Sequence, residues 1–154
     1  MKNLVIIITL IFVSGACRMQ SRSTTQSEDI IEQSYDITEK YWKLIELNGV
    51  PLVFEDSLSR APYIILKNAD NRVSGHGGCN TLTGSYEIDR VSNRIKFSQM
   101  ASTMMSCLKM ENEDRLKKAL EMADNYALSA DGKFLSLNRA RMAPLARFEA
   151  IYLN

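Results

Sequence analysis

Residues 75–80 read GHGGCN and residues 101–107 read ASTMMSC. The stretch from Gly75 to Cys107 that these two segments bound holds four of the seven glycines, the only histidine and two of the three cysteines. Glycine allows positive φ angles and close approach of the backbone. Cysteines that lie apart in the sequence can cross-link a small exported domain. This stretch is therefore where the sequence constrains the conformation of the chain most strongly.

The segments on both sides of this stretch are typical of short antiparallel β-strands. Ser85–Ile88 and Arg94–Phe97 alternate polar and apolar residues with period two, as half-buried strands do. Asn48-Gly49 and Asp131-Gly132 are strong turn dipeptides. The expected strands cover residues 41–47, 63–67, 72–75, 85–88, 94–97, 126–129, 134–137 and 144–152. In the last of them, Ala146, Phe148, Ala150 and Tyr152 are expected to share one face.

One segment, Glu111–Ala123, has helical rather than strand periodicity. Its charged residues include the pairs Glu113–Lys117 and Asp114–Lys118, each four residues apart, which we expect on a solvated helix face. Its apolar stripe consists of Leu116, Ala119, Leu120 and Ala123. The predicted fold class is mainly β (α+β). It is a small antiparallel, barrel-like curved sheet of about eight strands, with one helix inserted after the fifth strand.

Size and charge limit the classes of function. A chain of 154 residues with 45% hydrophobic and 24% charged residues fits one globular domain. It carries 19 basic and 18 acidic residues. Lys2 is the only charged residue among residues 1–16, so removal of this segment would leave equal numbers of basic and acidic residues. A neutral chain lacks the basic surface that binds phosphate backbones, so we expect no nucleic-acid partner.

The N-terminus is typical of an export signal. A positive start precedes ten residues, Leu4–Val13, that are apolar except for Thr9, and small residues then lead to Cys17. The run SGAC at residues 14–17 resembles a bacterial lipoprotein lipobox, although Ser14 stands where leucine is commoner. The resemblance implies cleavage before Cys17 and its lipidation. Ordinary secretion with a coincidental cysteine is the alternative.

The N-terminal part therefore divides into two expected segments. Residues 1–16 are a signal peptide, and residues 17–38 are a lipidated cysteine followed by a flexible tether rich in Ser, Thr and Gln. Arg18 follows the cysteine, which favours the outer membrane over inner-membrane retention. The domain itself is expected over residues 39–154.

Residues 42–47 with Asn48-Gly49, residues 75–80, residues 84–86 and residues 103–107 occur in this order along the domain. Together these segments resemble the META domain family, which includes the bacterial heat-shock lipoprotein HslJ. The resemblance covers about residues 40–152. It implies a small β-rich fold with one helix, an envelope location, and links to heat shock and antibiotic tolerance, with no established catalytic residues. The motif residues are Trp42, Gly75, Gly78, Cys79, Asn80, Gly84, Tyr86, Thr103, Met105 and Cys107.

Cys79 and Cys107 allow more than one chemistry. After lipidation of Cys17 the remaining cysteines are even in number, and export would place them in an oxidising compartment. A structural disulfide is the favoured interpretation, and free thiols or a redox couple are the alternatives. A metal site with His76 lacks a convincing fourth ligand. We therefore expect no metal and no cofactor.

No motif in the chain indicates catalysis. The glycines lack the Lys-Ser/Thr sequence of a phosphate-binding loop, and one histidine limits any nucleophile–base pair to His76. We expect Trp42 to be a core anchor. The methionines at 100, 104, 105 and 110 are expected to fill the core, with an adaptable binding surface as the alternative.

The expected function is that of a non-enzymatic, monomeric outer-membrane lipoprotein with a binding or structural role in stress or antibiotic tolerance. An envelope protein or a small apolar ligand is the expected partner. One alternative is a carrier of a small apolar ligand inside the barrel. The other is a lipid-tethered thiol-redox or hydrolytic enzyme centred on His76, Cys79 and Cys107.

Overall fold

The computed structural model describes residues 36–53, 61–107 and 110–152. The signal peptide, Cys17 and most of the expected tether lie outside the described residues. The elements are β1 (Tyr41–Leu47), β2 (Val50–Pro51), β3 (Tyr63–Lys67), β4 (Arg72–His76), β5 (Thr81–Asp89), β6 (Arg94–Phe97), β7 (Ala101–Ser102), α2 (Glu111–Met122), β8 (Asn125–Leu128), β9 (Phe134–Asn138) and β10 (Ala146–Ile151).

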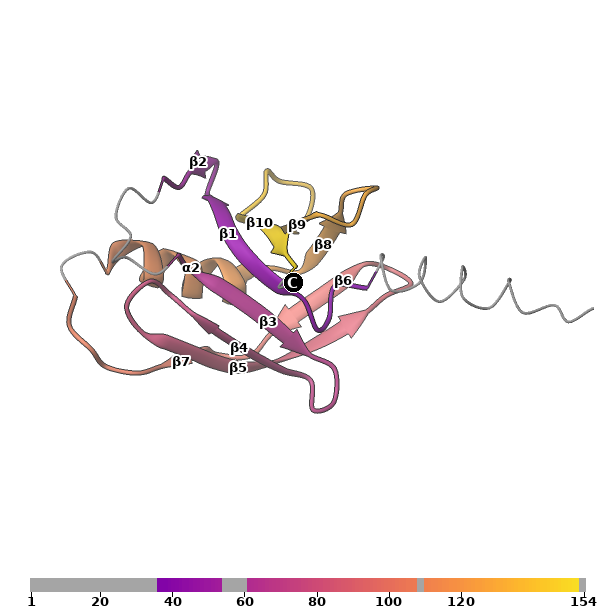
Figure 1. Cartoon of the computed structure of the whole chain (residues 1–154). Helices are drawn as coiled ribbons and strands as arrows, with labels where there is room; N and C mark the ends of the chain where they lie inside the picture. The colour runs from indigo at the N-terminus through magenta and orange to yellow at the C-terminus, as the bar shows by residue number, and fades with distance from the viewer. Residues whose placement is uncertain (1–35, 54–60, 108–109, 153–154) are drawn as a thin grey trace, which may run out of the picture.

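Eight antiparallel strands form a closed barrel (Figure 1). The order around it is β1-β3-β4-β5-β6-β8-β9-β10, and β10 closes the ring by pairing with β1. In that closing pair Trp42 lies opposite Ala150, and Leu44 lies opposite Phe148. The short strands β2 and β7 pair with β1 and β5 outside the ring. The predicted fold class is confirmed, including the helix after the fifth barrel strand.

Helix α2 lies across one end of the barrel. It contacts β6 on one side of the ring and β1 and β10 on the opposite side. A helix packed on the outer surface of the barrel could not reach both sides, so α2 must cross the opening. Figure 1 shows the helix at this end of the barrel. Its residues Leu116 and Leu120 are fully buried, so the apolar face of the helix closes this end of the barrel. In the described part of the chain, no helix is long and apolar enough to cross a membrane.

Core side chains fill the barrel. Trp42, Val73, Leu82, Ile95 and Leu135 are each at most 1% exposed, and they come from β1, β4, β5, β6 and β9, on all sides of the ring. The indole Nε1–H of the tryptophan, which would otherwise be an unpaired buried donor, donates to a backbone carbonyl oxygen at 2.7 Å. The prediction that this tryptophan anchors the core is confirmed.

The chain enters the domain at the end opposite α2. Ile37 is 1% exposed, and its carbonyl accepts the tryptophan bond just described. The backbone N–H of Glu39 donates to the carbonyl of Leu66, and Asp36 pairs with Arg90 at 3.4 Å. The folded part therefore begins by residue 36, earlier than the boundary at 39 that composition suggested, because Ile37 is a core residue within a polar run.

The bounds of two predicted strands, β5 and β10, need correction, and two short strands, β2 and β7, are not predicted at all. Strand β5 begins at Thr81 rather than at Ser85, because pairing with β4 and β7 continues the strand across Gly84, a residue type that strands disfavour. The two-residue strands β2 and β7 are too short to leave a periodic signal. Strand β10 ends at Ile151, so Tyr152 is 60% exposed and does not share the buried face.

Candidate functional site

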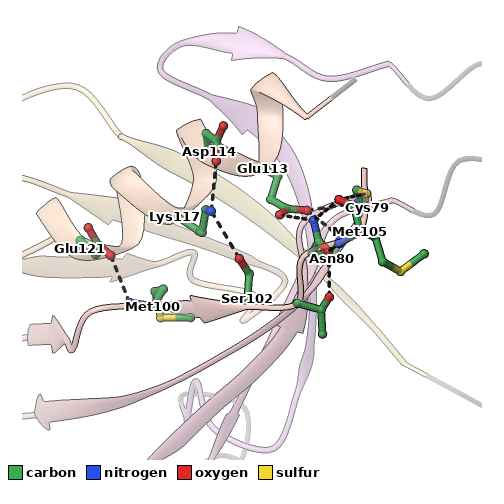
Figure 2. Close-up of polar contacts among 10 residues, drawn as sticks. Cys79, Asn80, Met100, Ser102, Met105, Glu113, Asp114, Lys117 and Glu121 are labelled. Atoms are coloured by element: carbon green, nitrogen blue, oxygen red, sulfur yellow. Dashed lines mark hydrogen bonds and ion pairs between the residues drawn. The ribbon is translucent and has the colours of Figure 1, made fainter. Parts of the chain in front are cut away.

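Most motif residues of the Gly75–Cys107 stretch meet at the end of the barrel that α2 covers. Three segments form the contact: the loop of residues 76–81, the segment of residues 103–107, and the first turn of α2. We call these residues together the clasp. Figure 2 shows its hydrogen bonds converging on Asn80 and Glu113.

Glu113 is the centre of the clasp, with no exposed surface. Its Oε2 accepts the backbone N–H of Asn80 at 2.7 Å and that of Cys79 at 3.3 Å, and its Oε1 accepts the Asn80 side-chain amide at 2.9 Å. Such charge-assisted bonds offset the cost of removing a carboxylate from water. The prediction that Glu113 and Lys117 pair on a solvated face is wrong: Lys117 pairs with Asp114 at 3.0 Å instead.

The role of Glu113 was missed although one sequence signal was present. Glu113, Leu116 and Leu120 are spaced by three and seven residues, so all three lie on the face that α2 buries. An acidic residue in an apolar stripe needs a compensating set of donors. Only the fold shows that the loop of residues 76–81 provides them.

Asn80 is 1% exposed and uses every hydrogen-bonding position of its amide. Its Oδ1 accepts from the Met105 backbone N–H at 2.7 Å and from the Thr103 hydroxyl at 2.8 Å. Its Nδ2 donates to the Met105 carbonyl at 3.2 Å as well as to Glu113. The amide thereby ties the segment of residues 103–107 to the helix through a single buried side chain.

Two glycines of the loop are required by this geometry. A Cβ at Gly77 would lie 2.3 Å from the Cγ and 2.7 Å from the Oε2 of Glu113. Gly78 has a φ of +112°, a conformation that other residues rarely adopt. The loop therefore approaches the helix more closely than any side chain would allow.

Cys79 and Cys107 form a disulfide, with their Cα atoms 6.0 Å apart. Cys79 is buried, whereas Cys107 is exposed. The bond fixes the end of the segment that Asn80 holds by hydrogen bonds. It is the structural disulfide that the sequence favoured over free thiols.

A family model for the META domain matches residues 35–152. The chain belongs to the META domain family. Its META domain is also similar in fold to solved structures. One, an NMR structure of a protein from Burkholderia xenovorans, is 17% identical with a TM-score of 0.59, covering 79% of this chain and 88% of that one.

A second structure, described as an NMR structure of a protein, is 19% identical with a TM-score of 0.56, covering 77% of this chain and 92% of that one. A third is the crystal structure of a DUF4847 family protein from Bacteroides vulgatus. It is 16% identical with a TM-score of 0.50, covering 73% of this chain and 93% of that one. At these identities the likeness concerns the fold alone. The comparison with curated proteins finds no match.

His76 takes part in local packing within the META domain. Its ring stacks on Tyr63 across the β3–β4 pair, at 6.3 Å between centroids and 9° between planes. Its Nδ1 accepts the backbone N–H of Gly78 at 3.0 Å. Among the residues that the structure describes, no three His, Cys, Asp or Glu side chains are grouped to hold a metal ion.

Three further motif residues, Gly75, Gly84 and Tyr86, lie in the barrel wall rather than in the clasp. Tyr86 is buried and its hydroxyl donates to the carbonyl of Lys67 at 3.2 Å; burial raises the pKa of this phenol. A Cβ at Gly84 would meet the sulfur of Met100 at 2.7 Å. The motif therefore marks two structural regions of the META domain, the wall and the clasp.

The prediction that the methionines fill the core holds only for Met100, which is 7% exposed. Met104 is 99% exposed and Met105 is 62% exposed. The reason is that Asn80 and the disulfide hold their backbone at the surface. These two residues line a depression of about 330 Å³, which lies between residues 102–106 and the start of α2.

Proposed function

We propose that this META domain is the folded part of a non-enzymatic bacterial envelope lipoprotein, anchored through Cys17. The favoured location is the outer membrane. Its role is binding or structural, within tolerance of stress or antibiotics. One observation carries the non-enzymatic part of the proposal: the polar groups of the clasp are used by one another. Both oxygens of Glu113, the whole amide of Asn80 and both sulfurs of the disulfide already have partners.

The same observation argues against an enzyme centred on His76, Cys79 and Cys107. A thiol nucleophile or redox couple needs a thiolate, and both sulfurs are bonded to each other. The His76 Nδ1 accepts a backbone N–H and stabilises the loop. A filled barrel likewise argues against carriage of a small apolar ligand in the interior.

Two observations support the envelope location. The lipobox-like run at residues 14–17 suits lipid anchoring, and a disulfide is persistent in oxidising compartments rather than in the cytosol. The path of the chain adds an orientation. Because residue 36 enters at the barrel end opposite α2, a lipid tether would leave the clasp end pointing away from its point of attachment.

Metabolic labelling with an alkyne analogue of palmitate tests the anchor. The full chain is expressed in bacteria, and the label is detected on the purified protein and followed through membrane fractionation. We expect label on the wild type, in the outer-membrane fraction, and none on Cys17→Ala. A Cys79→Ser/Cys107→Ser double variant is the control, because it keeps the lipid site and should stay labelled. An unlabelled wild type in the soluble fraction would contradict the anchor.

A second experiment tests the non-enzymatic role. A strain that lacks the protein and is sensitive to envelope stress is complemented with the wild type or with His76→Ala. We expect equal complementation at equal protein levels. Loss of complementation by a folded His76→Ala protein would support the enzyme alternative instead.

A further inference from the structure

The two exposed methionines, Met104 and Met105, lie beside the depression that separates residues 102–106 from α2. Methionine normally fills gaps in a hydrophobic core. Here neither side chain contributes to the core, and Figure 2 shows Met105 pointing away from Asn80 and Glu113. The position of the two thioethers therefore has no explanation in the stability of the fold.

A third methionine lines the same depression from the other side. Met110 is the N-cap residue of α2 and is partly buried. The depression, about 330 Å³, is small enough for flexible side chains on its rim to meet across it. Three methionines from two separate segments thus line one small depression.

The backbone that carries the exposed pair is held in place. The Met105 N–H and carbonyl are both bonded to the Asn80 amide, and Thr103 N–H donates to the Thr81 carbonyl at 3.2 Å. The disulfide of Cys107 fixes the next residues. A ligand that binds these thioethers therefore orders side chains only and does not have to order a loop, which favours binding.

The charges around the depression exclude the common hard cations. Both oxygens of Glu113, the only carboxylate in its lining, already accept hydrogen bonds. The ammonium of Lys117 is paired with the Asp114 carboxylate at 3.0 Å, so this lysine offers no ligand and its charge is balanced. Calcium and magnesium require oxygen ligands, and zinc prefers thiolate, imidazole and carboxylate. Neutral thioethers instead select soft monovalent ions such as Cu(I).

We propose that Met104, Met105 and Met110 form a binding site for a soft monovalent cation, with Cu(I) as the biological ion. The site consists of neutral sulfur ligands from the clasp and from the N-terminal end of α2. This inference goes beyond the proposed envelope role and does not depend on the lipid, since all three residues belong to the folded domain. Binding involves no change in the oxidation state of the protein.

Silver(I) serves as the probe, because it is an air-stable ion with the same preference for thioethers. The full chain carries Cys17→Ser, so that no free thiol competes, and is kept without reductant so that the disulfide stays intact. Its methionines are labelled with ¹³C in the methyl group and observed by NMR. At one equivalent of silver we expect the methyl signals of Met104, Met105 and Met110 to shift.

Met142 provides the matched control, because it is 67% exposed but lies outside the depression. Its signal should not move at one equivalent, and Met142→Leu should bind silver as the wild type does. A Met104→Leu/Met105→Leu variant should bind at least tenfold more weakly, with an unchanged thermal midpoint. Anaerobic competition with a coloured Cu(I) chelator should give the same order of the three proteins.

Two results would overturn the proposal. One is that the signal of Met142 shifts at the same silver concentration as that of Met104, which would mean unspecific binding to any exposed thioether. The other is that the folded double variant binds silver or Cu(I) as tightly as the wild type. Either result would leave the labelling experiment on Cys17 unaffected, so the two proposals fail separately.

Discussion

Replacing Glu113 by glutamine keeps the shape of the side chain and removes its charge. The carboxylate now accepts bonds on both oxygens: two backbone N–H groups on Oε2 and the Asn80 amide on Oε1. A glutamine amide has one oxygen, so it can serve only one of these two groups of donors. Asn80 cannot rotate to compensate, because its Oδ1 already accepts from Met105 and Thr103.

The magnitude follows from the bonds lost. A hydrogen bond to a charged group contributes about 1.5–3 kcal/mol, and a buried donor left without an acceptor costs about 1–3 kcal/mol. Part of this loss is offset, because a neutral amide costs less to bury than a carboxylate. We therefore expect Glu113→Gln to lower the free energy of unfolding by about 2–4 kcal/mol, a large share of the ~5–15 kcal/mol typical of a domain.

Urea unfolding with the disulfide intact measures this loss. With a denaturant slope of about 2 kcal/mol/M, the middle of the usual range, the midpoint should fall by roughly 1–2 M. Asp114→Asn is the matched control on the next residue. Its side chain is 66% exposed and only pairs with Lys117, so its effect should stay within about 0.5 kcal/mol. If Glu113→Gln unfolds within the same margin of the wild type, the buried carboxylate does not hold the clasp together.

The remaining predictions concern the loop, the disulfide and acid. Gly77→Ala places a Cβ against the buried carboxylate of α2 and should cost about 1–3 kcal/mol in the same unfolding assay, whereas an unchanged midpoint would show that the loop relaxes freely. Reduction of the disulfide, which joins residues 28 apart, should cost about 3–4 kcal/mol. Iodoacetamide should label Cys79 and Cys107 only after reduction, and labelling without reductant would contradict the bond. Hydrogen bonds from the Ser129 hydroxyl and a backbone N–H lower the pKa of Asp131 below its usual 3.8. Its stabilising contribution is therefore present above that pH and lost as the pH falls through the lowered value. Asp131→Asn should flatten the loss of thermal stability below about pH 4 and leave the slope near neutrality unchanged; an equally steep loss in the variant would refute this assignment.

Much of the barrel could be predicted because its strands are amphipathic. In Arg94–Phe97 and in Phe134–Asn138 every second residue is buried in the core. This period of two is visible in the sequence even when the neighbouring strands are not known. The first half of β5 could not be predicted in this way. Its residues Thr81–Gly84 are held as a strand by β4 on one side and β7 on the other.

The errors at the candidate site have a common cause. The usual behaviour of their residue types predicts that the charge of Glu113 pairs on the helix surface and that Met104 fills the core. The fold shows the opposite for both residues: the carboxylate of Glu113 is buried, and the side chain of Met104 is exposed to water. Unpaired N–H groups in the loop attract the carboxylate, and the Asn80 amide with the disulfide holds the methionine segment outside.

The sequence by itself determined the fold class, the family and the choice of the Gly75–Cys107 stretch as the most constrained part of the chain. These properties depend on local periodicity, turn residues and motif spacing, which a single chain carries without knowledge of its contacts. Only the tertiary structure decided what that stretch does. Closure of β10 onto β1 and the placement of α2 across the barrel end bring Glu113 to Asn80, 33 residues earlier in the chain. Such a contact depends on how distant segments pack, and for this reason the clasp and the methionine-lined depression appear only in the folded protein.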